Sequence, residues 1–414
     1  MGKVIDKDQS IKILQDIIQI KSENGHEEEV AKYFQSLLAD HDIESKLVQY
    51  DDDRASLVAE ISNGEGPVLG ITGHLDVVGA GDEDDWEYPP FSAHIDDDNV
   101  LWGRGASDMK PGIAAMVINF IEFKESQNFK GTLRLLATVG EEVGQYGSNQ
   151  LTREGYVDDL DAILIGEPCN VGIVYTHMGS LNYTLTSKGE AAHSSAPQLG
   201  VNAVENLTEA VSQISKAVED KAEEFNNEEL GKTFHNVTII KGGSQVNSLP
   251  EYAEYEANAR TIPEFDNNGV MDIVRSVIDD LNKKDGFDLA VEVTADQPPV
   301  NSPKDSKLIQ TIREVTKDHE RLGFQYLLKQ MGQVLGTDLV KDQPELGKVD
   351  EILPIAIAGT TDAAQFTQGN STMDIAVYGP GVPQLNHKLN ERIPVQQYLD
   401  FIDVYNDIIK SYLS

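Results

Sequence analysis

The stretch Val68-Leu69-Gly70-Ile71-Thr72-Gly73-His74-Leu75-Asp76 is a short apolar run that leads directly into a histidine and an aspartate. A run of this length, too short for a helix, is typical of a buried strand. Two later runs end in the same way: residues 133–139 lead into Gly140-Glu141-Glu142, and residues 163–165 lead into Gly166-Glu167-Pro168. The sequence therefore predicts several buried strands with polar side chains at their carboxyl ends.

Segments with helical spacing alternate with these runs. Apolar side chains recur every three or four positions in residues 11–18 and 27–38, and a further helix is expected over 110–123, just after Asp108. We also expect strands at 56–61, 355–358 and 373–378, and helices at 306–317 and 395–412. Such alternation favours an α/β fold with a mostly parallel sheet flanked by helices.

Residues 180–294 follow a different order. Strands are expected at 181–187, 236–241, 252–259 and 288–294, and helices at 201–218 and 270–281. This β-α-β-β-α-β succession is that of the ferredoxin-like unit. We therefore predict a larger domain formed by 1–178 and 295–414, with a small unit inserted at 179–294. Residues 322–349 show no clear pattern and receive no assignment.

The composition excludes several classes of function. With 33 Lys+Arg against 70 Asp+Glu, the chain of 414 residues carries a net charge of −37, which disfavours nucleic acids and anionic membranes as partners. No apolar run approaches the length of about 20 residues that spans a bilayer. The charged N-terminus does not resemble a signal peptide, and the single cysteine, Cys169, suits a reducing compartment. We expect a cytoplasmic protein.

The polar side chains after the strands indicate a metal site. In open α/β sheets, ligands bind outside the carboxyl ends of the strands. Residues of this kind follow five expected strand or helix ends: His74 with Asp76, Asp108, Glu141 with Glu142, Glu167, and His387. Imidazoles and carboxylates together suit zinc, cobalt or manganese, and an acid beyond the ligands would be free to act as a base.

Each of these residues also has an ordinary structural explanation. A single histidine at a strand end is more often a hydrogen-bonded structural residue, and an aspartate at a helix start is usually an N-cap. The joint placement of all of them favours the metal site. Other signatures of catalysis, such as His-Glu-x-x-His, a phosphate-binding loop or a Gly-x-Ser-x-Gly elbow, do not occur in the sequence.

Four ordered motifs resemble those of one known family. They are Gly73-His74-Leu75-Asp76, Gly103-Arg104-Gly105 with Asp108-Met109-Lys110, Gly140-Glu141-Glu142, and Gly166-Glu167-Pro168. The chain is similar to the dinuclear zinc metallopeptidases and deacylases, which include succinyl-diaminopimelate desuccinylases, acetylornithine deacetylases, aminoacylases and glutamate carboxypeptidases. The similarity covers nearly the whole chain and is strongest to the desuccinylases. It implies a zinc exopeptidase-like fold with an inserted lid that also forms a homodimer.

The resemblance implies a role for each residue of the metal site. Asp108 would bridge two divalent ions, zinc or else cobalt or manganese; His74 and Glu167 would complete one site, and Glu142 and His387 the other. Asp76 would hydrogen-bond the His74 ring, as metal-bound imidazoles require. Glu141 would be the general base that activates water.

The resemblance also implies roles in the inserted unit. His193 would stabilise the oxyanion, in its own subunit's site or in that of the partner. Asn247, Arg260, Ser180 and Thr360 would hold the substrate, and the fork of an arginine suits a carboxylate. One departure concerns the acyl group: well-known desuccinylases have Arg-Arg-Gly-Ser where this chain has His177-Met178-Gly179-Ser180, so a guanidinium is replaced by an imidazole.

The expected activity is the hydrolysis of N-succinyl-LL-diaminopimelate to succinate and LL-diaminopimelate, a step of lysine biosynthesis. Removal of another acyl group from an amino acid, as in acetylornithine deacetylase, and cleavage of dipeptides or peptide carboxyl ends remain alternatives. A non-catalytic amino-acid-binding protein with the same fold is disfavoured, because Glu141 and all five expected ligands are present.

Overall fold

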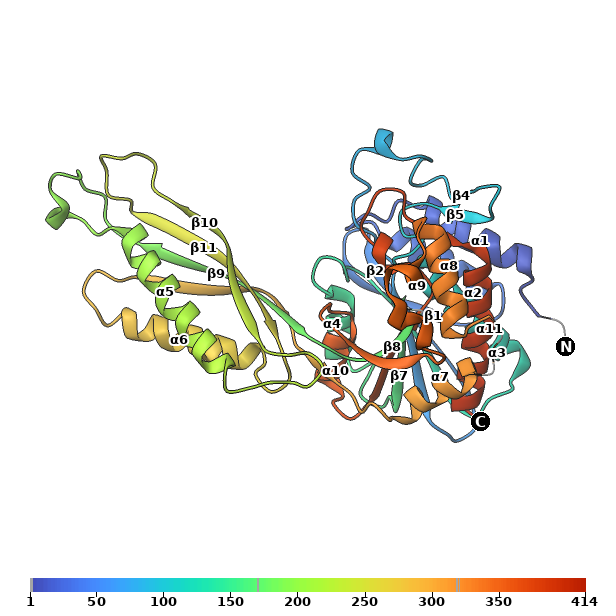
Figure 1. Ribbon diagram of the computed structural model, residues 1–414. Helices are drawn as coiled ribbons and strands as arrows, with labels where there is room; N and C mark the ends of the chain where they lie inside the picture. The colour runs from blue at the N-terminus through green and yellow to red at the C-terminus, as the bar shows by residue number, and fades with distance from the viewer. Residues whose placement is uncertain (1–2, 170, 318, 320) are drawn as a thin grey trace. The chain divides into compact units, whose positions relative to one another are not determined.

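The computed structural model describes residues 3–169, 171–317, 319 and 321–414, and the chain divides into two compact units (Figure 1). Unit 1 comprises Met1–Tyr175, Ser302–Ile355 and Thr361–Ser414, and unit 2 comprises Thr176–Asn301 and Ala356–Thr360. The predicted insert, 179–294, lies inside unit 2. The short segment Ala356–Thr360, which the sequence pattern placed in the larger domain, groups with unit 2 instead.

Unit 1 is built on a mixed sheet whose central strands are parallel. In the order β1-β2-β6-β3-β7-β15-β8, the four strands β6 (Gly131–Thr138), β3 (Val68–His74), β7 (Ala162–Pro168) and β15 (Asp374–Gly379) run parallel. The flanking strands β1 (Ser45–Asp51), β2 (Arg54–Asn63) and β8 (Gly172–His177) are antiparallel to their neighbours. The predicted α/β class with a mostly parallel sheet is confirmed, and β1 is a strand that the pattern missed.

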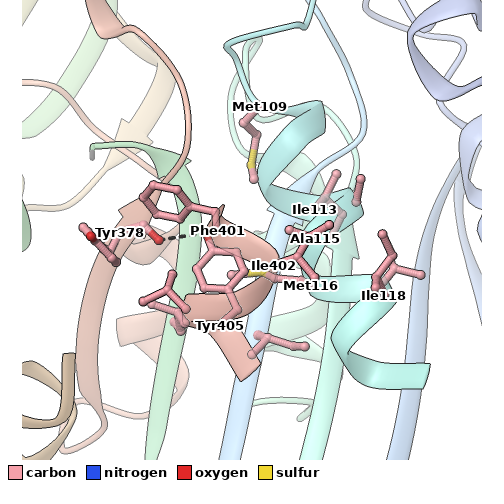
Figure 2. Close-up of a cluster of buried hydrophobic side chains, with 14 of the residues drawn as sticks. Met109, Ile113, Ala115, Met116, Ile118, Tyr378, Phe401, Ile402 and Tyr405 are labelled. Carbon is pink, nitrogen blue, oxygen red and sulfur yellow. Dashed lines mark hydrogen bonds between the residues drawn. The ribbon is translucent and has the colours of Figure 1, made fainter. Parts of the chain in front are cut away.

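Helix α3 (Lys110–Ser126) lies in the centre of the unit 1 core. Nearly all of its side chains are buried, as expected for a helix that is apolar on all sides. Figure 2 shows Ile113 and Met116 of α3 in the same buried cluster as Tyr378 of β15 and Phe401 of α11 (Val395–Tyr412). This packing fixes the N-terminus of α3, which begins two residues after Asp108.

The remaining helices of unit 1 complete its outer layers. They are α1 (Lys7–Gln19), α2 (Glu28–Ala39), α4 (Tyr146–Arg153), α7 (Lys307–Lys317), α8 (Phe324–Leu335), α9 (Leu339–Asp342) and α10 (Ala363–Gly369). Helices α8 and α9 lie in residues 322–349, for which no structure was predicted. Helix α8 forms there because Leu327, Leu328 and Met331 recur on one face and join the core, and it ends at Gly336 in the left-handed conformation (φ 69°).

Unit 2 has the predicted ferredoxin-like topology. Its elements are β9 (Gly179–Lys188), α5 (Ala203–Ala222), β10 (Phe234–Gly242), β11 (Tyr252–Thr261), α6 (Asn267–Leu281) and β12 (Leu289–Gln297), with the sheet order β10-β11-β9-β12. Both helices pack on one face of this antiparallel sheet (Figure 1). Strand β11 alternates buried and more exposed residues, so the opposite face is open to solvent.

A separate small sheet in unit 1 joins β4 (His94–Ile95), β5 (Val100–Trp102) and β16 (Arg392–Pro394). Strand β16 directly follows the segment that carries His387, and β5 precedes the segment that leads to Asp108. Within the described residues, no helix is long and apolar enough to cross a membrane.

Candidate metal centre

The carboxyl ends of the central strands bring the five expected ligands together in unit 1. His74 is the last residue of β3, Glu142 lies just beyond β6, and Glu167 lies near the end of β7. Asp108 precedes α3, and His387 lies in the loop after β15. The parallel arrangement of β6, β3 and β7 explains why residues so far apart in the sequence meet at one sheet edge.

Asp108 lies between the two histidines. Its Oδ1 is 3.3 Å from Nε2 of His74, and its Oδ2 is 3.3 Å from Nε2 of His387. His74 Nε2 is also 3.5 Å from Oε1 of Glu167, and His387 Nε2 is 2.9 Å from Oε2 of Glu142. A carboxylate that presents one oxygen to each imidazole has the geometry needed to bridge two cations.

Asp76 contacts the His74 ring through its main-chain oxygen and not, as expected, through its carboxylate. The His74 ring meets the main-chain oxygen of Asp76, at 2.9 Å from Nδ1, whereas the Asp76 carboxylate is 3.5 Å from that nitrogen. The two carboxylate oxygens accept the backbone N–H groups of Glu141 and Glu142, each at 3.1 Å. Asp76 therefore orients the His74 ring with its backbone and the Glu141-Glu142 turn with its side chain.

Burial and neighbouring charge shift the pKa of the clustered groups. Burial raises the pKa of Glu141 and Glu167 well above the ordinary value, and nearby carboxylates raise it further. The pKa of His74 is also raised, because Glu167, Asp108 and Asp76 outweigh its burial. Hydrogen bonds to Asp108 and Glu142 raise the pKa of His387 to about 10.

The donor set fits divalent cations. Ligand atoms of His74, Glu141 and Glu167, and those of His74, Asp108 and Glu142, lie within 4.8 Å of one another. Buried carboxylates at this density are costly unless positive charge compensates them. Two imidazoles with several carboxylates are a donor set that suits zinc, cobalt or manganese. His74, Glu167 and Asp108 would hold one ion, and Asp108, Glu142 and His387 the other.

Asp362 is a buried residue of this region to which the sequence assigned no role. Its carboxylate accepts hydrogen bonds of 2.6 Å from the hydroxyls of Thr138, at the end of β6, and Ser148, in α4. It therefore ties together the two elements on either side of Glu141. Burial raises its pKa to about 6. In the sequence, the only feature that could have pointed to this role was the position of Asp362 in Gly359-Thr360-Thr361-Asp362, just before α10.

Lys110 is a second buried group without a predicted role. Its Nζ donates to the carbonyls of Ile17, at 2.6 Å, and Ile20, at 2.9 Å. It therefore ties the first turn of α3 to the end of α1, and burial lowers its pKa to about 7. Its place in Asp108-Met109-Lys110, ahead of an apolar helix, was the only hint in the sequence.

Arg260, one of the expected substrate residues, lies on the open face of the unit 2 sheet, and the buried Ser180 lies beside it on the adjacent strand. Arg260 of β11 and Gln297 of β12 both pair with Ser180 of β9, so the three form a row across adjacent strands. Thr360 donates to the side chain of Gln297 at 3.3 Å. Within the described part of the chain, the Arg260 guanidinium has no hydrogen bond or ion pair. The sequence did not single out Gln297.

His193 and Asn247 lie on neighbouring exposed segments of unit 2. Residues His193 and Ser248 form a β-bridge, and the carbonyl of Asn247 accepts the N–H of Ser194 at 3.0 Å. The His193 ring is exposed, with Nδ1 2.8 Å from the hydroxyl of Ser195. The expected oxyanion residue and one expected substrate residue are thus close in space.

His177, where the desuccinylases have arginine, is fully buried at the end of β8. Its Nδ1 is 2.8 Å from the carbonyl of Met178, and burial lowers its pKa to about 4. The ring is therefore neutral near pH 7, and it is not accessible on the surface of unit 2.

A centre of two histidines and several carboxylates at the edge of a parallel sheet is typical of a metal-dependent hydrolase. The chain belongs to the family described as peptidase family M20/M25/M40, whose model matches residues 70–411. One solved structure of the same family, from Bacillus subtilis, is described as a dinuclear metal-binding peptidase, and the clusters of histidine and carboxylate in this chain could likewise hold metal ions.

Two full-length relatives carry the same name. The chain is 39% identical over 99% of both sequences to a "Probable succinyl-diaminopimelate desuccinylase" of Staphylococcus epidermidis. It is 35% identical over 98% of both to a protein of the same name from Staphylococcus aureus.

Two solved structures with this fold carry other names. A tripeptidase of Staphylococcus aureus has a TM-score of 0.70 at 21% identity, with 99% of both chains covered. A metallo-carboxypeptidase of Sulfolobus solfataricus has a TM-score of 0.72 at 18% identity, covering 98% of this chain and 99% of that one. At these identities the likeness establishes the fold.

Proposed function

We propose that this protein hydrolyses the amide bond of N-succinyl-LL-diaminopimelate, releasing succinate and LL-diaminopimelate for lysine biosynthesis. The choice of this substrate is supported by the full-length identity of 35–39% to staphylococcal proteins named as probable desuccinylases. The hydrolytic step itself is supported by the centre around Asp108 in unit 1.

The mechanism follows from the residues around the centre. Two bound divalent ions, zinc in our proposal, supply Lewis acidity and lower the pKa of water toward neutrality. Glu141 accepts a proton from the attacking water and returns it to the leaving amine. Asp76 keeps Glu141 in place by accepting its backbone N–H, and Asp362 holds the strand and helix on either side.

Unit 2 would contribute the residues that bind the substrate. The unpaired Arg260 guanidinium suits a substrate carboxylate, with Ser180 on the adjacent strand and Thr360, bonded to Gln297, as further hydrogen-bonding groups. Asn247 lies in the loop before β11, at the end of the strand away from Arg260, and would bind the substrate together with His193. His193 would donate a hydrogen bond to the developing oxyanion.

A homodimer formed through unit 2 would bring His193 into the partner's site. Strand β10 lies at the edge of the sheet and exposes Phe234 (48%), Ile239 (43%) and Ile240 (59%). An exposed edge strand with apolar side chains favours pairing with another chain.

One observation favours peptidase activity as a second candidate. The buried and neutral His177 provides no fixed positive charge for a succinyl carboxylate at the position where the resemblance places one. A dipeptide or tripeptide substrate has no such carboxylate at its amino end, so its binding would not require that charge.

A substrate panel decides between these activities. The zinc-, cobalt- and manganese-loaded protein is assayed with N-succinyl-diaminopimelate, N-acetylornithine, other N-acyl amino acids, dipeptides and tripeptides. We expect the highest kcat/KM for N-succinyl-diaminopimelate. Cleavage restricted to peptides would reject the desuccinylase proposal while leaving the metal centre intact, and turnover of none of them would reject amide hydrolysis.

A further inference from the structure

A buried ion pair links the two loops that carry Asp108 and His387. The side chain of Glu391 is fully buried, and Arg104 is 2% exposed. Glu391 Oε1 accepts the backbone N–H groups of Ser107, at 2.7 Å, and Asp108, at 2.9 Å. Its Oε2 accepts a hydrogen bond of 2.6 Å from Nη1 of Arg104. A residue four positions after His387 thus holds the main chain of Asp108.

Arg104 extends this link back to the His387 loop. Its Nη1 also donates to the carbonyl of Lys388, next to His387, and its Nη2 donates to the carbonyl of Gly79. The guanidinium lies 5.1 Å from the centre of the Trp86 ring. Arg104 is therefore fixed on several sides, and it connects the segment before Asp108 to the segment after His387.

His387 depends on such support more than His74 does. The side chain of His74 is 1% exposed and stands on a central strand, whereas that of His387 is 53% exposed and lies in a loop. The backbone of His387 has φ 62°, and that of Asn390 has φ 60°, both left-handed. Non-glycine residues hold this conformation where surrounding contacts impose it.

We propose that Glu391 and Arg104 are positioning residues that set the affinity of the second metal position, the one formed by Asp108, Glu142 and His387. Among the described residues, neither forms a hydrogen bond or ion pair with the side chain of a proposed metal ligand. They act by fixing the Asp108 backbone and the His387 loop relative to each other. This inference rests on the two-metal function proposed above.

The test is metal binding to the Glu391→Gln variant. The glutamine can still accept the two backbone N–H groups, but its amide would face the Arg104 guanidinium and lose the ion pair. Loss of a partner behind a metal ligand typically costs about 10- to 100-fold in metal affinity. We expect that loss for the second ion alone, with the first ion bound as in the unchanged protein, in titrations with Zn²⁺ and Co²⁺.

The absorption spectrum of the cobalt-loaded protein gives a readout that is independent of activity. With one equivalent of Co²⁺ the spectra of the variant and the unchanged protein should match, and with the second equivalent they should differ. Arg104→Lys, which keeps the charge but not the fork, should show a smaller loss of the second ion. It also serves as the test should Glu391→Gln fail to fold.

Asp400→Asn is the matched control. Asp400 is also a buried carboxylate of unit 1 paired with an arginine, with Oδ1 3.1 Å from Nε of Arg321, and it belongs to α11 rather than to a ligand loop. Its variant should lower the melting temperature without changing metal binding. Unchanged affinity for the second ion in Glu391→Gln, or equal weakening of both ions, would overturn the inference. Fewer than two ions in the unchanged protein would instead reject the two-metal function.

Discussion

The two units place their histidines in opposite surroundings. In unit 1, His74 and His387 lie within 3.5 Å of several carboxylates, and the pKa of both rings is raised. In unit 2, burial lowers the pKa of His177, and His193 is exposed beside a serine hydroxyl. Unit 1 thus assembles a cation site from its own core, whereas unit 2 offers hydrogen-bonding groups and, at Arg260, a guanidinium on the open sheet face that pairs with no described residue. In our proposal, unit 1 therefore supplies the metal centre and the base, and unit 2 supplies the substrate-binding residues and the oxyanion donor His193.

The largest effect should come from the proposed base in unit 1. Replacing Glu141 with Gln removes the proton acceptor, and general acid–base catalysis typically contributes about 10²- to 10⁴-fold to the rate. We expect kcat to fall by that factor while two metal ions remain bound, measured by steady-state kinetics and elemental analysis. Loss of an ion in this variant would show that Glu141 is a metal ligand. This outcome is a real alternative, because ligand atoms of Glu141, His74 and Glu167 lie within 4.8 Å of one another.

The next effect should come from unit 2. Replacing His193 with Ala should lower kcat by about 10²- to 10³-fold, the usual cost of losing one oxyanion donor. KM should change little, because the donor acts in the transition state. The exposed His26 of unit 1 provides the control, and His26→Ala should leave the kinetics unchanged.

Co-expression of two inactive variants tests whether His193 acts across a dimer. In a mixed dimer of Glu141→Gln and His193→Ala subunits, one site recovers both groups only when His193 is supplied by the partner. We expect activity well above that of either variant alone. Activity no higher than that of the single variants would place His193 in its own subunit's site.

A smaller effect is expected at Arg260. A charge-assisted hydrogen bond is worth about 1.5–3 kcal/mol, so Arg260→Gln should lower kcat/KM by about 10- to 100-fold, mostly through KM. Arg275 of α6 is an exposed arginine of the same unit, and Arg275→Gln should leave both constants unchanged. Equal effects of the two variants would mean that the positive charge that each arginine adds to unit 2, rather than a direct contact with Arg260, attracts the substrate.

The sequence predicted the main elements of both units, but not the hydrogen bonds that join separate elements. The ferredoxin-like order of unit 2 and the parallel core of unit 1 followed from periodicity, because buried strands and amphipathic helices leave local patterns. The convergence of His74, Asp108 and Glu167 also followed, since parallel strands end at one edge. Helix α8 was missed because its single apolar face lies in a segment rich in polar residues and glycines. The contacts of Glu391, Asp362 and Gln297 could not be predicted, because each joins residues from different elements through hydrogen bonds that no local pattern encodes.

The smallest effect should appear at His177, and it concerns stability rather than catalysis. Burial lowers the pKa of His177 to about 4 in the folded chain, so below pH 6.5 the unfolded chain binds a proton that the folded chain does not. Stability from this residue is therefore present near pH 7 and lost as the pH falls from 6.5 toward 4. At pH 5.5 the loss is about 1.2 kcal/mol relative to pH 7. Urea unfolding of the metal-free protein should show this pH dependence, and His177→Gln should lack it. If both proteins show the same dependence, His177 is charged in the folded chain, and the argument that it provides no charge for an acyl carboxylate fails.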